Sequence, residues 1–160
     1  MSEREIINYW NGKCFGCSPT NPHGLKLRLW YSDRGCFTRY VVPDYLCGFD
    51  GLVHGGILAL LIDEVSEWTV ISLLGRFGVT TEMTIRYLNP ADICTEITIE
   101  GQILNHDDRN GILQTVVHSA DGKLLAECRS KWIFPGLSTL AKIGKFEESM
   151  LNEFLSHYPQ

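Results

Sequence analysis

The chain has 160 residues, which is enough for one globular domain and too few for two of ordinary size. Hydrophobic residues make up 44% and charged residues 21% of the sequence, a composition that excludes disordered, collagen-like and coiled-coil chains. With 14 basic and 19 acidic residues, the formal net charge is −5, so we expect no nucleic acid as a partner.

Two features of the sequence bear on its compartment. No apolar stretch follows the acidic N-terminal residues, so we expect no secretory signal and a cytoplasmic location. The apolar stretch 57–74 contains Asp63, Glu64 and Glu67, which would be costly in lipid, so we expect no membrane partner. The six cysteines are therefore expected to be reduced thiols.

Alternating apolar and polar residues predict six strands in mostly antiparallel order. The first two form a hairpin around Asp33-Arg34-Gly35, and Asn110-Gly111 and Asp121-Gly122 are further hairpin turns. The predicted strands cover residues 25–29, 36–42, 79–87, 97–103, 112–118 and 123–134.

One helix is predicted between the second and third strands, over about residues 55–75, with apolar side chains in nearly every direction. Such a helix must be buried, and a sheet that curls around it is the simplest solution. We therefore expect an α+β fold, with a six-stranded antiparallel sheet wrapped around one long central helix. We expect this domain to span 1–135, and 136–160 to be a helical extension with a docked helix over about 145–157.

The start of the central helix and one carboxylate within it are the main candidates for chemistry. His54, Gly55 and Gly56 open the helix, where free backbone N–H groups and the helix dipole favour a developing oxyanion. Asp63 lies on an otherwise apolar helix, and loss of water would make it a stronger base. The alternative is that Asp63 is an exposed carboxylate on the same polar face as Glu64 and Glu67.

This pattern resembles the hotdog-fold acyl-CoA thioesterases of the phenylacetic-acid-degradation type. The resemblance rests on His54-Gly55-Gly56 with an acid nine residues after the histidine, on the run from Gly78 to Ala91 (GVTTEMTIRYLNPA), and on the opening segment from Cys14 to Leu25. It covers roughly residues 14–134. It implies a hotdog fold and hydrolysis of an acyl-CoA thioester without a cofactor.

The resemblance also implies roles for individual residues. Asp63 would be the catalytic carboxylate, either as nucleophile or as base on water, and Thr80 would position that water. The Gly55 N–H would polarise the thioester carbonyl, with help from His54. Several relatives place an amide side chain about six residues before the histidine, but here that residue is Gly48, with Asp50 as the nearest polar neighbour.

The spacing of these groups predicts an oligomer. Gly55 and Asp63 are eight residues apart, which on one helix corresponds to about 12 Å of rise, whereas both must lie within roughly 3 Å of one reacting centre. We therefore expect Asp63 of one subunit to face Gly55 of another, in a homodimer or a dimer of dimers (homotetramer).

Other residues are candidates for substrate binding, each with a structural alternative. Arg86, with Arg76, Arg129 and Lys131, would meet the phosphates of coenzyme A, or these are scattered surface cations. Glu82 is expected on the strand face of Thr80, where it would line the site, or it is an exposed strand acid. Trp68 would bound an acyl pocket with Phe49 and Leu52, or belong to the core.

Two metal-like patterns are expected to bind no metal. Cys14-x-x-Cys17 with His23 nearby suggests zinc, but the chain has no second such pair to complete four ligands. The sequence His106-Asp107-Asp108 is read as part of a solvated turn between strands.

Two rival functions remain open. A hydratase or dehydratase on the same fold would need His54 and Asp63 at one pair of substrate carbons. A non-catalytic acyl-CoA-binding module is the other rival, and Gly48 in place of an amide favours it.

Overall fold

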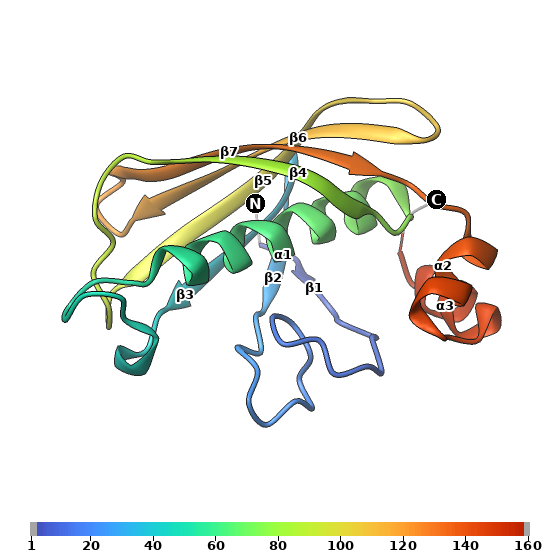
Figure 1. Cartoon of the computed structure of the whole chain (residues 1–160), viewed down its shortest axis with the longest axis horizontal. Helices are drawn as coiled ribbons and strands as arrows, with labels where there is room; N and C mark the ends of the chain where they lie inside the picture. Colours follow the sequence, from blue (N-terminus) through green and yellow to red (C-terminus); the bar gives the residue numbers. More distant parts are fainter. Residues whose placement is uncertain (1–2, 159–160) are drawn as a thin grey trace.

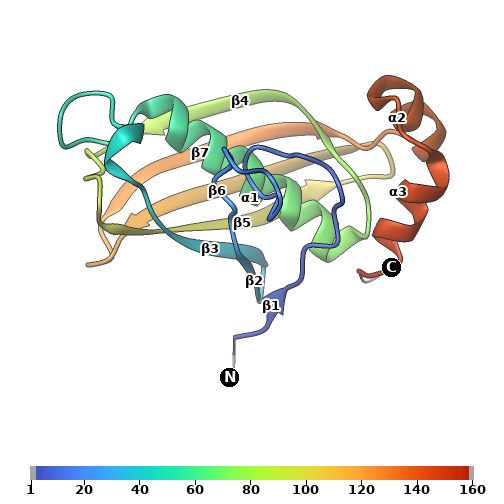
Figure 2. The same ribbon diagram turned by 90° about the horizontal axis from the view of Figure 1, so that it is seen from below.

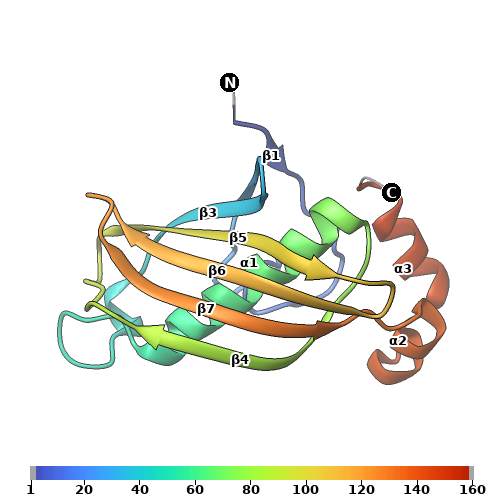
Figure 3. The same ribbon diagram turned by 90° about the horizontal axis from the view of Figure 1, so that it is seen from above.

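The computed structural model describes residues 3–158 as one curved antiparallel sheet over a long helix (Figure 1). The sheet has seven strands in the order β1-β2-β3-β5-β6-β7-β4, so β4 is an edge strand (Figure 3). The fold class predicted from sequence is confirmed. The strands are β1 Glu5–Ile6, β2 Leu29–Ser32, β3 Gly35–Val41, β4 Val79–Tyr87, β5 Glu96–His106, β6 Asn110–Ser119 and β7 Leu124–Ile133.

The N-terminal part of the sheet differs from the prediction of six strands. β1 has only two residues, too few for a recognisable alternation, and pairs with β2. The predicted strand at 25–29 was wrong for residues 25–28, because β2 begins at Leu29 and Lys26 has a φ of 53°, which breaks an extended backbone. Leu25 and Leu27 are nevertheless buried in the hydrophobic core, and their N–H groups donate to the carbonyls of Phe15 and Gly16.

The central helix α1 spans Gly55–Leu74, as predicted. It ends at Gly75, whose φ of 58° is the left-handed conformation that glycine adopts readily at a helix C-terminus. Leu61, Ile62 and Val65 are fully buried. The concave side of the sheet covers one side of α1, and the N-terminal segment before β2 crosses another side (Figure 2).

The C-terminal segment folds as two short helices, α2 Leu137–Gly144 and α3 Glu148–Leu155, beside the C-terminal end of α1 (Figures 1 and 3). The single helix predicted over 145–157 begins too early, because Lys145 has a φ of 56° and ends α2. The 3₁₀ helix η1 covers Asp44–Leu46. None of the helices in residues 3–158 is both long and apolar enough to cross a bilayer.

Candidate functional site

His54 is the N-cap of α1. Its Nδ1 accepts a hydrogen bond from the Gly56 N–H at 2.9 Å, so that N–H is already bound within the chain. Gly55, between them, is the first residue of the helix, and its N–H has no acceptor within the described residues. The expected group of free N–H donors is therefore reduced, with Gly55 as the one best placed to bind an oxyanion.

A cleft of about 590 Å³ lies over this end of α1. Its lining is mostly apolar and includes Phe49, Leu52 and Leu58, together with Tyr87 at the end of β4 and the segment 88–91 that follows it. Tyr87 lies beside the helix start, where its hydroxyl donates to the Gly55 carbonyl at 2.9 Å. Phe49 is 81% exposed, so the wall of the cleft presents a large apolar side chain to solvent.

Asp63 and Thr80 form the second half of the candidate site. Thr80 is on β4, and its hydroxyl donates to Asp63 Oδ1 at 2.6 Å. Asp63 is half-buried, with the buried Cys128 of β7 nearby. Burial and, as the smaller cause, the negative charge of Asp63 raise the pKa of the Cys128 thiol to about 11, so the thiol stays neutral.

Within one chain the two halves are separate. The helix α1 is continuous from Gly55 to Leu74, so the eight residues between Gly55 and Asp63 correspond to about 12 Å along the axis. Neither Asp63 nor Thr80 lines the cleft at the helix start. The geometry thus brings Asp63 to Thr80, and His54 to Gly55 and Gly56, but does not join the two groups.

Glu82 lies on the opposite face of β4 from Thr80, contrary to the prediction. A β-bulge between Thr80 and Glu82 shifts the register, so that Thr80 pairs with the buried Trp132 and Glu82 with the exposed Lys131. Glu82 accepts a salt bridge from Lys131 at 2.9 Å. Arg86 is also exposed and pairs with Glu127 at 2.6 Å.

The remaining candidates fall outside the cleft lining. Trp68 is 2% exposed and belongs to the core, and Asp50 is an exposed turn residue. Gly48 does line the cleft. The solvated turn after β5 is confirmed, since Asp107 accepts the N–H groups of Arg109 and Asn110.

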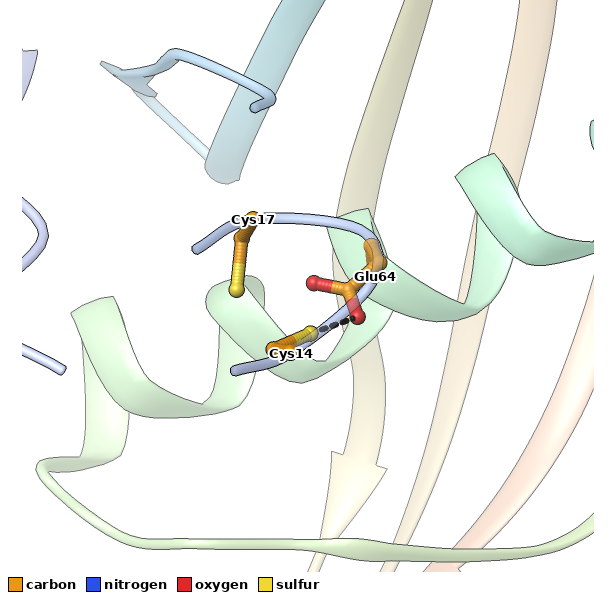
Figure 4. A group of neighbouring side chains, drawn as sticks. All are labelled: Cys14, Cys17 and Glu64. Atoms are coloured by element: carbon orange, nitrogen blue, oxygen red, sulfur yellow. Dashed lines mark hydrogen bonds between the residues drawn. The ribbon is translucent and has the colours of Figure 1, made fainter. Parts of the chain in front are cut away.

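The structure places Glu64, rather than the His23 considered from the sequence, beside Cys14 and Cys17 (Figure 4). The Cys14 thiol donates to Glu64 Oε1 at 2.9 Å, and Glu67, one turn further along α1, accepts the Gly78 N–H. Both glutamates are half-buried, so the interpretation of an exposed polar face was wrong. The cysteine pair was visible in the sequence, but nothing in its spacing pointed to a carboxylate on α1.

The comparisons with known proteins agree with one another, because the family model and the relatives are all thioesterases. Residues 50–126 match the family model described as the thioesterase superfamily. Acyl-coenzyme A thioesterase 13 of Mus musculus is 33% identical over 81 residues, which are 49% of this chain and 58% of that protein. Acyl-coenzyme A thioesterase THEM4 of Bos taurus is 32% identical over 81 residues, 51% of this chain and 32% of that protein.

A solved structure supports the fold over a longer stretch. Zebrafish thioesterase superfamily member 2 is 26% identical, covers 69% of this chain and 82% of its own, and superposes with a TM-score of 0.63. The chain therefore spans most of this neighbour, but little more than half the length of the mouse relative.

Proposed function

The chain contains a thioesterase-superfamily domain of the hotdog fold, and on this premise we propose that it hydrolyses an acyl-CoA thioester to a carboxylic acid and free coenzyme A. The observation that carries the proposal is the hydrogen bond between Thr80 and the half-buried Asp63, on a helix whose N-terminus opens into an apolar cleft. The names of the curated relatives support the same substrate class.

In the proposed mechanism, Asp63 attacks the thioester carbon or removes a proton from the water that does so. Thr80, whose hydroxyl contacts Asp63, orients the carboxylate or the water. The carbonyl oxygen gains negative charge and binds to the Gly55 N–H, and a preorganised donor of this kind lowers the barrier by about 3–4 kcal/mol. The carbon–sulfur bond then breaks. If Asp63 is the base, the proton that it took from water passes to the departing thiolate, and the carboxylic acid is released. If Asp63 is the nucleophile, the acyl group remains on Asp63 as an anhydride, the thiolate takes up a proton from solvent, and a water molecule then hydrolyses the anhydride. Neither route needs a cofactor or metal.

The proposed active site is shared by two subunits. Because Asp63 and Gly55 are separated along α1, the reacting carbonyl must lie between Asp63 of one protomer and Gly55 of another. The position of β4 supports this arrangement, since Thr80 lies on this edge strand, where one side is unpaired. Val79, Tyr87 and Leu88, at the ends of β4 and just beyond it, are partly exposed apolar residues of the kind that a homodimer interface buries.

Arg86 remains our candidate for binding the phosphates of coenzyme A. Its ion pair with Glu127 lies on the exposed face of the sheet, where such pairs contribute only about 0–1 kcal/mol. A phosphate could therefore replace the carboxylate at little cost. Arg129 and Lys131 lie on the same exposed face of the neighbouring β7, which supports an anionic ligand there.

The variant Asp63→Asn tests the proposed chemistry. It keeps the size of the side chain and an acceptor for Thr80 but removes the nucleophile or base, so we expect kcat for thiol release from acyl-CoAs to fall about 10²–10⁴-fold. The Kd for acyl-CoA should change little. Glu82→Gln is the matched control. It also removes one carboxylate charge, but from the outer face of β4, away from Asp63, so this variant should retain turnover.

The same measurements separate the rival functions. Tight binding of acyl-CoA by the unaltered chain without thiol release would identify an acyl-binding module. A change in absorbance with an enoyl-CoA, without thiol release, would identify a hydratase. Full turnover by Asp63→Asn would exclude Asp63 from the mechanism.

A further inference from the structure

The cluster at Cys14, Cys17 and Glu64 brings three metal-binding side chains together from two distant parts of the chain. Their ligand atoms all lie within 4.8 Å of one another. The two cysteines come from the N-terminal segment, and Glu64 comes from α1, next to Asp63 (Figure 4). The three side chains point toward one another (Figure 4).

The surroundings of the cluster are acidic and lack a cation. Glu67 lines the same pocket as Cys14, Cys17 and Glu64. Within residues 3–158, neither Glu64 nor Glu67 takes part in a salt bridge. A bound divalent cation would supply the missing positive charge.

We propose that Cys14, Cys17 and Glu64 bind one Zn²⁺ ion. Thiolate sulfur and carboxylate oxygen together are ligands that zinc accepts, whereas Mg²⁺ and Ca²⁺ prefer oxygen alone. On binding, the thiol protons pass to solvent, and no oxidation takes place. This site is independent of the proposed hydrolysis, because none of its ligands belongs to the proposed catalytic set.

The geometry needs only a small adjustment to hold the ion. Bonds of about 2.3 Å to sulfur and about 2.0–2.2 Å to oxygen place tetrahedral ligands roughly 3.3–3.8 Å apart. The hydrogen bond of 2.9 Å between Cys14 and Glu64 would open by less than about 1 Å to admit the metal. This contact marks where the ion would replace the thiol proton.

The fourth ligand would be water. A pocket of about 210 Å³ adjoins the cluster, and its wall includes the aromatic residues Trp68, Phe77 and Phe154. It provides both a route of entry and room for a water molecule. The zinc would tie the segment around Cys14 to α1, beside the carboxylate that we assign to hydrolysis.

Cobalt is the direct probe of this site. Protein kept reduced and freed of metal by a chelator would be titrated with Co²⁺, and cysteine coordination gives a thiolate-to-cobalt charge-transfer band in the near ultraviolet. We expect the band to saturate at one Co²⁺ per chain and to disappear when Zn²⁺ is added, because zinc binds thiolate sites more tightly. Absence of the band from protein with all six thiols free would overturn the proposal.

Variants locate the ligands. Cys14→Ser and Cys17→Ser should abolish the band, and Cys94→Ser, which alters an exposed cysteine outside the cluster, should retain it. A band that survives in both cluster variants would overturn the assignment. Circular dichroism would show whether the variant of the buried Cys17 still folds. If it does not fold, the variant Glu64→Gln tests the site instead. It should weaken Co²⁺ binding at least about 10-fold, and an unchanged Kd would exclude Glu64 as a ligand.

Discussion

At the scale of single residues, the contact between Thr80 and Asp63 has the clearest functional consequence. Thr80→Val keeps the shape of the side chain and removes the hydroxyl that donates to Asp63 at 2.6 Å. If this hydroxyl orients the carboxylate or its water, kcat for thiol release should fall about 10–100-fold, because a hydrogen bond to a charged group contributes about 1.5–3 kcal/mol. Steady-state kinetics of thiol release measures the effect.

Thr80→Ser is the control for this prediction. This variant keeps the hydroxyl and removes only the methyl group. Its kcat should stay within a factor of about 3 of that of the unaltered chain, a difference of roughly 0.6 kcal/mol in the barrier. An unchanged kcat in the valine variant, beside a loss in the serine variant, would show that the methyl group matters and that the hydrogen bond does not.

The same residues show how far sequence reasoning reaches at this scale. The resemblance placed Thr80 near Asp63, and the structure brings the two together. Strict alternation failed at Glu82, because a β-bulge adds a residue without any mark in the sequence. Glu64 was also missed as a neighbour of Cys14, because two residues 50 positions apart meet only through the fold.

At the scale of elements, the position of α1 depends on two glycines of the sheet. A Cβ on Gly101 of β5 would lie 2.3 Å from Thr69 Oγ1 and 3.2 Å from the Val65 carbonyl, both on α1. A Cβ on Gly35 of β3 would meet Thr69 as well. The sheet and α1 therefore approach each other more closely than any residue with a side chain would allow.

Gly101→Ala should therefore push α1 away from the sheet. We expect the free energy of unfolding to fall by about 1–3 kcal/mol, as for other overpacked cores, and urea denaturation measures this change. In a Thr69→Ala background the closest contact is gone, so the same substitution should cost less. Additive losses in the double variant would contradict the proposed clash.

The helices and strands differ in how clearly they can be predicted from the sequence. The bounds of α1 and β4 were predicted closely. The helix α1 is a long apolar run that starts at a histidine–glycine sequence and ends at a glycine, and β4 is an alternation of nine residues; both patterns are strong signals. β1 was missed because its two residues show no period. The division between α2 and α3 depends on a lysine in the left-handed conformation, which composition does not predict.

At the scale of the whole molecule, α3 closes one end of the core. Phe154 is 5% exposed, and its ring centroid lies 5.2 Å from that of Phe77 and 6.1 Å from that of Trp68 on α1. Phe154→Ala should lower the free energy of unfolding by about 3–5 kcal/mol in chemical denaturation. Ile143→Ala, at a position 71% exposed on α2, should change it by less than about 0.5 kcal/mol. Similar losses in both variants would contradict this role of α3.

The shared active site makes a prediction for mixed subunits. Asp63→Ala removes the carboxylate, and Gly55→Pro removes the N–H. Proline is tolerated at the first position of a helix, and His54 before it already has the extended ψ of 132° that proline requires. Each variant alone should therefore fold and be nearly inactive in thiol release.

Mixing the two variants should restore activity only if each site draws Asp63 and Gly55 from different chains. A heterodimer then has one site with both defects and one intact site. Random exchange of equal amounts makes about half of the dimers mixed, so the mixture should recover about a quarter of the activity of the unaltered chain. Differently tagged chains that copurify would prove that exchange took place. If copurified heterodimers remain inactive, Asp63 and Gly55 of different chains do not act on the same thioester and the shared site is wrong. Because a continuous helix also holds the Asp63 and Gly55 of one chain about 12 Å apart, at least one of the two would then take no part in the reaction.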